Sequence, residues 1–432
     1  MLNSSHDLTE PDDLMGAIMA IEGIRDAAVL LNGPTGCRSL YAPLSDSRFP
    51  RSDHLDWTVY DEEFYFGRPR VPSTYLDETD YVFGSAAKLK RLLAAITAKD
   101  YALIAVINSP AAALIGDDLE RLLREANSPV PAIAIETPGF SRSIAQGFQN
   151  TLRAALRQLA PPEMQPIPKQ INLLGISIYH KYWEGNVATL RQLLQPAGIT
   201  VGTVLSADCS VADIRQMRQA ECNVVIHEEY ADQLTPWLAS EYGMKTLLPQ
   251  EGAPIGFDAT ETWIREVCQT LKVDPTPSLK LILDAKRRAF LPLNRFNRET
   301  GLPKGATFAI RAEASLAYPL LKWLYSYLGM VPVAIQVTET SNRLARACQD
   351  YLNSIDRLEA WNADLKAQAP DIIFSNGATL SRLIGEGLSV SGVELSLPST
   401  DHIDIIPKAL LGTRGTLFIL EHILNNLHHY YL

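Results

Sequence analysis

Short apolar runs alternate with amphipathic segments from the start of the chain. The continuous apolar runs at residues 27–32, 102–108 and 131–137 predict buried parallel strands. Between them, residues 88–99 and 117–127 carry apolar side chains at helical spacing. Strand–helix alternation of this kind predicts βαβ units and a doubly wound sheet.

The same alternation returns twice. The proline-rich stretch Ala160–Gln170 predicts a linker. A second unit then follows, and a helical segment around residues 260–298 connects it to a third. The predicted strands of these two units are residues 171–179, 199–205, 222–230, 306–312, 331–337 and 371–376, and the predicted helices are residues 187–198 and 316–329.

This pattern predicts an α/β protein of three Rossmann-like domains with mainly parallel sheets. We place them at residues 1–165, 166–300 (with the helical bridge) and 301–432 (with a C-terminal helix). At roughly 150 residues per domain, the length of 432 residues agrees with three domains.

Composition narrows the class of function. The 47% apolar content excludes wholesale disorder, and the net charge of −10 disfavours nucleic acid or an anionic membrane as a partner. No apolar run approaches the roughly 20 residues that span a bilayer, and the polar, acidic start is unlike a signal peptide, so we expect a cytoplasmic address. The five cysteines form no CxxC motif, which argues against a disulfide framework or a self-contained zinc site.

Ligands of α/β proteins gather at the carboxyl ends of strands, so the loops there carry the candidate chemistry. None has a GxGxxG or GxxxxGK[ST] pattern, so we do not expect the chain to bind ATP itself. In the turn Asn32–Cys37, Gly33 and Gly36 predict a tight bend that presents Cys37 at a helix start, which favours its thiolate. The alternative is a small buried cysteine in a glycine turn. Asp117 and Asp118 are better explained as helix caps than as a metal pair.

Several motifs occur in an order that resembles component 1 of nitrogenase and its relatives. These relatives include the light-independent protochlorophyllide reductase, chlorophyllide reductase and the nickel-tetrapyrrole reductive cyclase. The resemblance covers nearly the whole chain. It is carried by NGPTGC (32–37), TYLDETDYVFGSAAKL (74–89), ALIGDDL (113–119), ETPGF (136–140), APIGFDATETW (253–263) and residues 397–423.

The resemblance implies three Rossmann-like domains around a buried site and pairing with a second, similar chain. It also implies an iron–sulfur cluster at the chain interface, which receives electrons from a separate ATP-hydrolysing iron protein. Electrons then pass to a cofactor or substrate deeper inside. The missing phosphate-binding loop agrees with this division of labour, in which ATP binds only to the iron protein.

The chain departs from the full cluster site, which takes up to three cysteines from each chain. At the three family positions it has Asp12 or a neighbour, Cys37, and Pro110 beside Ser109. A [4Fe–4S] cluster takes four ligands, so the resemblance implies a cluster shared with a homologous three-cysteine chain, to which Cys37 adds the last thiolate. Asp12 is either an extra carboxylate ligand or part of a solvated acidic N-terminus. We expect the remaining cysteines to be packing residues: Cys209, Cys222, Cys268 and Cys348.

Two histidines fall near the family's cofactor-holding positions. His227 ends a predicted strand of the second domain, and His402 lies in the third. Imidazole can hold a metal or act as an acid, so we predict both as catalytic residues beside a second metal cofactor or a tetrapyrrole. The alternative is a satisfied polar group at a strand end. We expect the C-terminal His428 to belong to a surface tail, and the aromatic–acidic loop 60–67 to line a pocket or the interface.

The sequence therefore predicts a subunit of a nitrogenase-like, ATP-dependent reductase, assembled as a two-plus-two heterotetramer. It would pass low-potential electrons to a buried cofactor or small molecule, with a tetrapyrrole suggested by the ligand count. A non-redox scaffold or carrier for a metal cofactor or tetrapyrrole is the alternative. A sugar- or metal-chelate-binding protein is a third, weaker one, because it would need a secretion signal.

Overall fold

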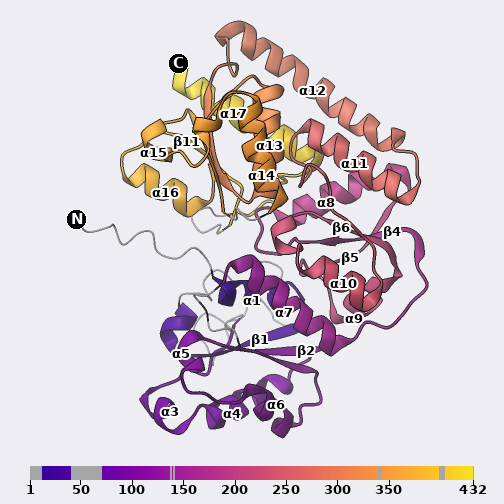
Figure 1. Cartoon of the computed structure of the whole chain (residues 1–432), viewed down its shortest axis with the longest axis vertical. Helices are drawn as coiled ribbons and strands as arrows, with labels where there is room; N and C mark the ends of the chain where they lie inside the picture. The colour runs from indigo at the N-terminus through magenta and orange to yellow at the C-terminus, as the bar shows by residue number, and fades with distance from the viewer. Residues whose placement is uncertain are drawn as a thin grey trace.

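The computed structural model describes residues 12–39, 71–136, 139, 142–338, 342–397 and 404–431. Its three sheets have only parallel strand pairs, and helices cover them (Figure 1). The predicted α/β class is confirmed. The strands of each sheet fall within one of the three predicted domain ranges, and the domain boundaries themselves stay a prediction.

The first sheet has the order β1-β2-β3. Every residue of β1 and β2 is buried, which explains why their sequences are apolar up to the asparagine that ends each strand. One face packs on α4 and α6, and the other on α1 and α7. The bounds are α1 Asp13–Glu22, β1 Ala27–Asn32, α3 Glu78–Phe83, α4 Ala86–Thr97, β2 Leu103–Asn108, α5 Pro110–Ala113, α6 Leu119–Ala126, β3 Ala132–Ile135 and α7 Ile144–Leu159.

The second sheet has the order β5-β4-β6-β7. Its first strand begins inside the predicted linker, because Ile167 already pairs with Ala220, and only residues 160–166 connect α7 to it. The predicted strand 222–230 is too long, since β6 ends at Val225 and a 3-10 turn, η3, follows at Glu228–Tyr230. The remaining bounds are β4 Ile167–Leu174, α8 Trp183–Leu194, β5 Thr200–Val204, α9 Val211–Gln216, β6 Ala220–Val225, α10 Leu234–Tyr242 and β7 Thr246–Leu247.

The third sheet has the order β11-β10-β8-β9. The helical bridge before it is two helices, which separate where Lys272 adopts a left-handed backbone. His428 is exposed, as expected for a surface residue, but it belongs to the last helix and faces the ring of Phe296 at 6.2 Å between centroids. The bounds are α11 Phe257–Leu271, α12 Thr276–Thr300, β8 Thr307–Ala312, α13 Ala314–Ser326, β9 Val331–Val337, α14 Arg343–Ser354, α15 Leu365–Gln368, β10 Ile372–Ser375, α16 Gly377–Gly385, β11 Ser391–Glu394 and α17 Gly412–Tyr431.

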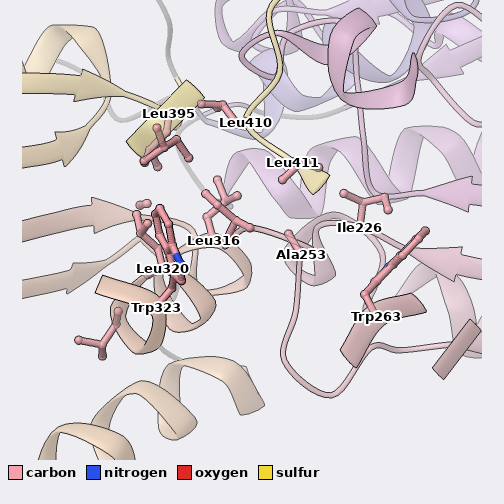
Figure 2. Packing of buried hydrophobic residues seen from close by; sticks show 14 of the residues in the cluster. Ile226, Ala253, Trp263, Leu316, Leu320, Trp323, Leu395, Leu410 and Leu411 are labelled. Carbon is pink, nitrogen blue, oxygen red and sulfur yellow. The ribbon is translucent and has the colours of Figure 1, made fainter. Parts of the chain in front are cut away.

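Two apolar cores connect the sheets. One core is shared by the first and second sheets and the other by the second and third. In the latter, Trp263 of α11 and Ile226 after β6 lie across from Trp323 and Leu320 of α13 (Figure 2). Burial of such large side chains contributes roughly 1.5–3 kcal/mol each, so the sheets are held together by their interiors rather than by isolated surface contacts.

Helices α1 and α7 cross at glycines that leave no room for a side chain. A Cβ atom on Gly147 would lie 2.0 Å from the Asp13 carbonyl oxygen, and one on Gly16 would lie 2.0 Å from that of Ile144. The backbone approach therefore requires glycine on both helices, and it fixes α1 against the first sheet.

We expect Gly147→Ala to lower the free energy of unfolding by about 2 kcal/mol or more, because the helices must separate to admit the methyl group. The measurement is urea unfolding. Gly385→Ala is the matched control, since no described atom lies within 4 Å of its added Cβ; it should change stability by less than about 1 kcal/mol. Equal midpoints for Gly147→Ala and the wild type would contradict the close crossing.

Candidate functional site

Cys37 is the one partly exposed cysteine among the five, and the other four are buried. It follows the end of β1 and lies in a short helical turn, residues 35–39. Burial raises the pKa of the thiols of Cys209, Cys222, Cys268 and Cys348, which suits packing residues. The structure thus presents a single accessible sulfur at the carboxyl end of the first sheet.

Glycine at position 33 lets this turn approach the next strand. A Cβ there would lie 2.6 Å from Ser109 Oγ, at the end of β2, and 3.6 Å from the Cβ of Cys37. Gly36 differs, because no described atom lies within 4 Å of an added Cβ. Steric crowding by Ser109 therefore explains why position 33 is a glycine. A cofactor-binding role for Gly33 and Gly36 stays a prediction.

The other two family ligand positions lie at the same edge. A Cβ on Gly139 would lie 2.5 Å from Pro110 Cγ and 3.4 Å from Asp12 Oδ2. Asp12 is only 8% exposed and caps α1, accepting a hydrogen bond from the Met15 N–H at 3.2 Å. A solvated acidic N-terminus is therefore the wrong description of Asp12, and its ligand role stays untested.

Among the described residues, this edge presents one accessible thiol and no complete set of metal ligands. Among the residues that the structure describes, no group of three or more His, Cys, Asp or Glu side chains lies close enough together to hold a metal ion. Pro110 has no donor atom, and Ser109 Oγ already accepts a hydrogen bond from the Ala112 N–H at 3.2 Å. Further ligands would have to come from outside this set.

Polar side chains fix the Cys37 turn in place. Asn32 Nδ2, at the end of β1, donates to Asn108 Oδ1 at the end of β2 (2.9 Å), and Asn32 Oδ1 accepts from Thr74 Oγ1 (2.9 Å). Thr74 Oγ1 in turn accepts from the Gly33 N–H at 3.0 Å. This network was not predicted from the sequence, although buried polar residues directly after apolar strands were a signal for it.

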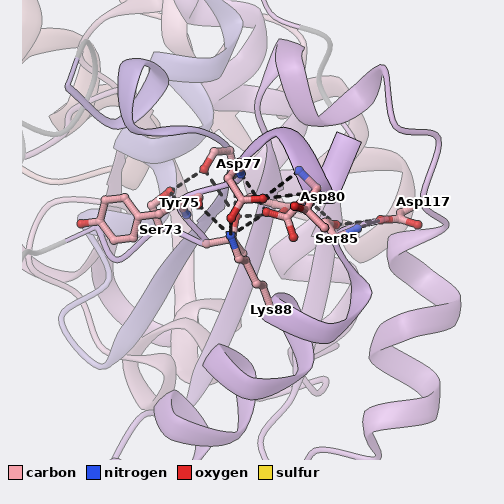
Figure 3. A network of polar contacts seen from close by, with 11 residues as sticks. Ser73, Tyr75, Asp77, Asp80, Ser85, Lys88 and Asp117 are labelled. Carbon is pink, nitrogen blue, oxygen red and sulfur yellow. Dashed lines mark hydrogen bonds and ion pairs between the residues drawn. The ribbon is translucent and has the colours of Figure 1, made fainter. Parts of the chain in front are cut away.

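Asp117 and Asp118 have different roles. Asp118 caps α6 as expected, accepting from the Arg121 N–H at 2.8 Å. Asp117 instead accepts from the Ser85 N–H at 2.6 Å and the Ser85 hydroxyl at 2.7 Å (Figure 3). Ser85 Oγ also accepts from Asn32 Nδ2 at 3.2 Å, so Asp117 supports the Cys37 turn through two intermediaries.

Short helix α3 lies beside the turn. Lys88 holds its start through Asp77 and Asp80, with N–O distances of 2.8 and 2.6 Å, which raises the pKa of Lys88 and lowers that of Asp77 (Figure 3). The pKa of Tyr81 is raised, mainly by burial and to a smaller extent by the nearby Cys37. Val82 and Phe83 are 74% and 84% exposed. We call Tyr81, Val82 and Phe83 the α3 patch.

A second polar centre lies where the carboxyl ends of the second and third sheets meet. His227, after β6, is 2% exposed, and its Nδ1 lies 3.2 Å from Ser315 Oγ of α13. Its ring stacks on that of His180 at 4.4 Å. Burial lowers the pKa of both histidines, to about 3 for His180, so both are neutral at pH 7. His402 and the loop 60–67 lie outside the described residues.

Two glutamates that were not predicted from the sequence complete this centre. Glu229 Oε1 accepts from the Ser315 N–H at 2.8 Å and from Asn342 Nδ2 at 3.0 Å. Glu313 directly follows β8, and burial raises its pKa to about 7. For Glu313 the available signal was an acidic residue directly after the predicted strand 306–312, whereas Glu229 lay inside the predicted strand 222–230.

Comparison with known proteins identifies the class. Residues 13–428 match the family model for nitrogenase component 1 type oxidoreductases, and the chain belongs to this family. It is 29% identical to a subunit of the light-independent protochlorophyllide reductase of Synechococcus sp. (strain RCC307), over 93% of this chain and 75% of that protein. It is 24% identical to the corresponding protein of Methylobacterium sp. (strain 4-46), over 91% of this chain and 74% of that protein.

Solved structures agree on the fold. Nitrogenase Cp1 at pH 6.5 superposes with a TM-score of 0.74 at 16% identity, over 96% of this chain and 92% of that one. The expected membership of the nitrogenase component 1 family is confirmed. In the described part of the chain, no helix has the length and apolar character needed to cross a bilayer.

The two buried histidines predict a stability that falls with acid. Their folded pKa values lie below the usual 6.5, so below that pH the unfolded chain binds protons that the folded chain does not. Each histidine contributes a slope of up to about 1.4 kcal/mol per pH unit.

We expect His180→Asn to reduce the loss of stability between pH 7 and pH 5. In the wild type, His180 Nδ1 accepts a hydrogen bond from the Ser177 N–H at 3.0 Å. The side-chain oxygen of asparagine can also accept this hydrogen bond, but asparagine does not titrate. Urea unfolding at both pH values measures the slope, and His428→Asn, at an exposed position of α17, is the control that should keep it. If stability falls as steeply between pH 7 and pH 5 in His180→Asn as in the wild type, His180 is not a buried neutral histidine.

Proposed function

We propose that this chain is the single-ligand subunit of a nitrogenase-like, ATP-dependent reductase. The observation that carries the proposal is the lone, partly exposed Cys37 at the end of β1, with a proline at the aligned third position. Membership of the nitrogenase component 1 family and the similarity to subunits of light-independent protochlorophyllide reductases support it.

In this proposal Cys37 supplies one thiolate to a [4Fe–4S] cluster, and a homologous three-cysteine chain supplies the rest. When bound, such a cluster provides one-electron, low-potential redox chemistry. The residues of this chain position the sulfur: Gly33 lets the turn reach Ser109, and the Asn32–Thr74 hydrogen bond holds the turn. Asp12 stays an alternative extra ligand.

The α3 patch supports a protein partner at this edge. Adjacent exposed apolar side chains are a common mark of protein interfaces, and Leu114, four residues after Pro110, is also exposed. We assign the patch to the three-cysteine chain. A separate iron protein, which alone would bind ATP, would supply electrons, and the whole would be a two-plus-two heterotetramer in the cytoplasm.

The proposed substrate site is the polar centre around His227, with His402 as its second predicted catalytic residue. The three predicted domains, 1–165, 166–300 and 301–432, would then divide the work: the first presents Cys37, and the other two enclose the substrate. A tetrapyrrole is the favoured substrate because the relatives reported above are named for one. A scaffold or carrier of a metal cofactor or tetrapyrrole is the second candidate, favoured by the two missing family cysteines.

Cys37→Ala should abolish the cluster of the assembled pair while leaving the chain folded. The measurement is iron and sulfide content after anaerobic co-purification with a three-cysteine partner, with circular dichroism to check the fold. Cys268→Ala removes a buried sulfur from the core and serves as the control that keeps the cluster. A full cluster in Cys37→Ala would end the assignment of Cys37 as a ligand.

The double variant Val82→Glu, Phe83→Glu should weaken association with the partner chain at least tenfold, equivalent to about 1.4 kcal/mol. Charged side chains there would be desolvated in the complex without a counter-ion. Analytical ultracentrifugation of the mixed chains measures this. Ile384→Glu places a charge on an exposed apolar position of α16 and should leave the affinity unchanged. Unchanged affinity in the double variant would remove the α3 patch from the interface.

A further inference from the structure

Glu313 lies at the carboxyl end of the third sheet, beside the polar centre around His227. It follows β8, an inner strand of the third sheet, and is the residue before α13. Ser315, two residues on, contacts His227 of the second sheet, so Glu313 stands at the meeting of the two strand ends. Its side chain makes no capping hydrogen bond to α13.

One oxygen atom of the Glu313 carboxyl group is left without a hydrogen bond among the described residues. Glu313 is 3% exposed, and its Oε2 has no hydrogen-bond partner in the described part of the chain. Oε2 of the neighbouring Glu229 likewise has no hydrogen-bond partner among the described residues. A buried oxygen without a partner is costly, and such atoms in folded proteins call for a specific explanation.

Two other buried carboxylates of this chain are paired with cations. Glu228 pairs with Arg343 at 2.6 Å, and Glu394 pairs with Lys181. His180 accepts a hydrogen bond at Nδ1 from the Ser177 N–H, which places its single proton on Nε2 as a neutral imidazole. Neutral imidazole is a poor acid, so neither stacked histidine is suited to release a proton at pH 7.

Glu313 differs from these groups. It forms no ion pair with any residue that the structure describes. The charged groups that act on it are Glu229, which disfavours its ionised form, and Arg311, whose opposing influence is smaller than that of burial. The result is a carboxyl group whose pKa is raised to about 7, so that it is partly protonated at pH 7.

We propose that Glu313 is the proton donor of the buried site. This inference rests on the proposed reductase function. For each electron that a low-potential one-electron donor delivers, the donor is oxidised by one electron and the substrate is reduced by one. The Glu313 O–H bond breaks as a new bond to hydrogen forms on the substrate. Glu313 is left as a carboxylate and regains a proton from water.

The test compares Glu313→Gln with the wild type in the assembled pair, with protochlorophyllide as probe and dithionite as electron source for the iron protein. We expect the reduction rate to fall at least 100-fold, as for loss of a general acid, with unchanged KM and iron content. The pH dependence near pH 7 should also disappear. Glu266→Gln, a part-buried carboxyl on α11 bonded to the Gln250 N–H, should retain wild-type rates.

Infrared spectroscopy of the chain alone gives a readout independent of activity. The wild type should show a protonated carboxyl band that titrates near pH 7 and is missing in Glu313→Gln. If Glu313→Gln does not fold, Glu313→Asp should restore the band and a fraction of the rate.

Two failures are distinguishable. A wild-type pair that does not reduce the probe refutes the proposed function. An active wild type together with a Glu313→Gln variant within threefold of its rate, or with the same infrared band, overturns the proton-donor role alone.

Discussion

The presentation of Cys37 depends on how closely β1 and β2 approach at their carboxyl ends. The Asn32–Asn108 hydrogen bond closes the two strand ends, and Gly33 permits a backbone path past Ser109 that any side chain would block. Thr74, Ser85 and Asp117 then hold the turn from outside. Motifs distant in the sequence therefore serve one purpose, which is to fix a single sulfur at the edge of the sheet.

The inner site depends on a different constraint. The second and third sheets share one apolar core, so the strand ends that carry His227 and Glu313 are held together and both side chains are buried. Burial lowers the pKa of both histidines and raises that of the Glu313 carboxyl to about 7. The same burial that stabilises the sheets thus sets the protonation of the groups between them.

Periodicity was enough to predict most of the sheets. β1 and β9 begin and end at the residues predicted from the apolar runs, because strands buried in a parallel sheet are mostly apolar. β7 has two residues and β11 contains a glycine, so neither carries a readable pattern. The split between α11 and α12 falls at the left-handed Lys272, and Pro275 and Pro277 at the start of α12 were its signal in the sequence.

The site was predictable only in part. Motif order and strand ends singled out Cys37 and His227, whose roles stay predictions. Asn32, Glu229 and Glu313 were not singled out, because their contacts join segments far apart in the chain. Asp12 shows the same limit, since an acidic residue near the N-terminus gave no sign that α1 would bury it.

The central claim is that this chain supplies one ligand to a cluster completed by another chain. The most direct test is iron and sulfide per chain, purified without oxygen, alone and with a three-cysteine partner. The account predicts about four irons per pair, and only with the partner. Iron-free preparations in both cases would contradict it and leave the scaffold or carrier as the surviving function.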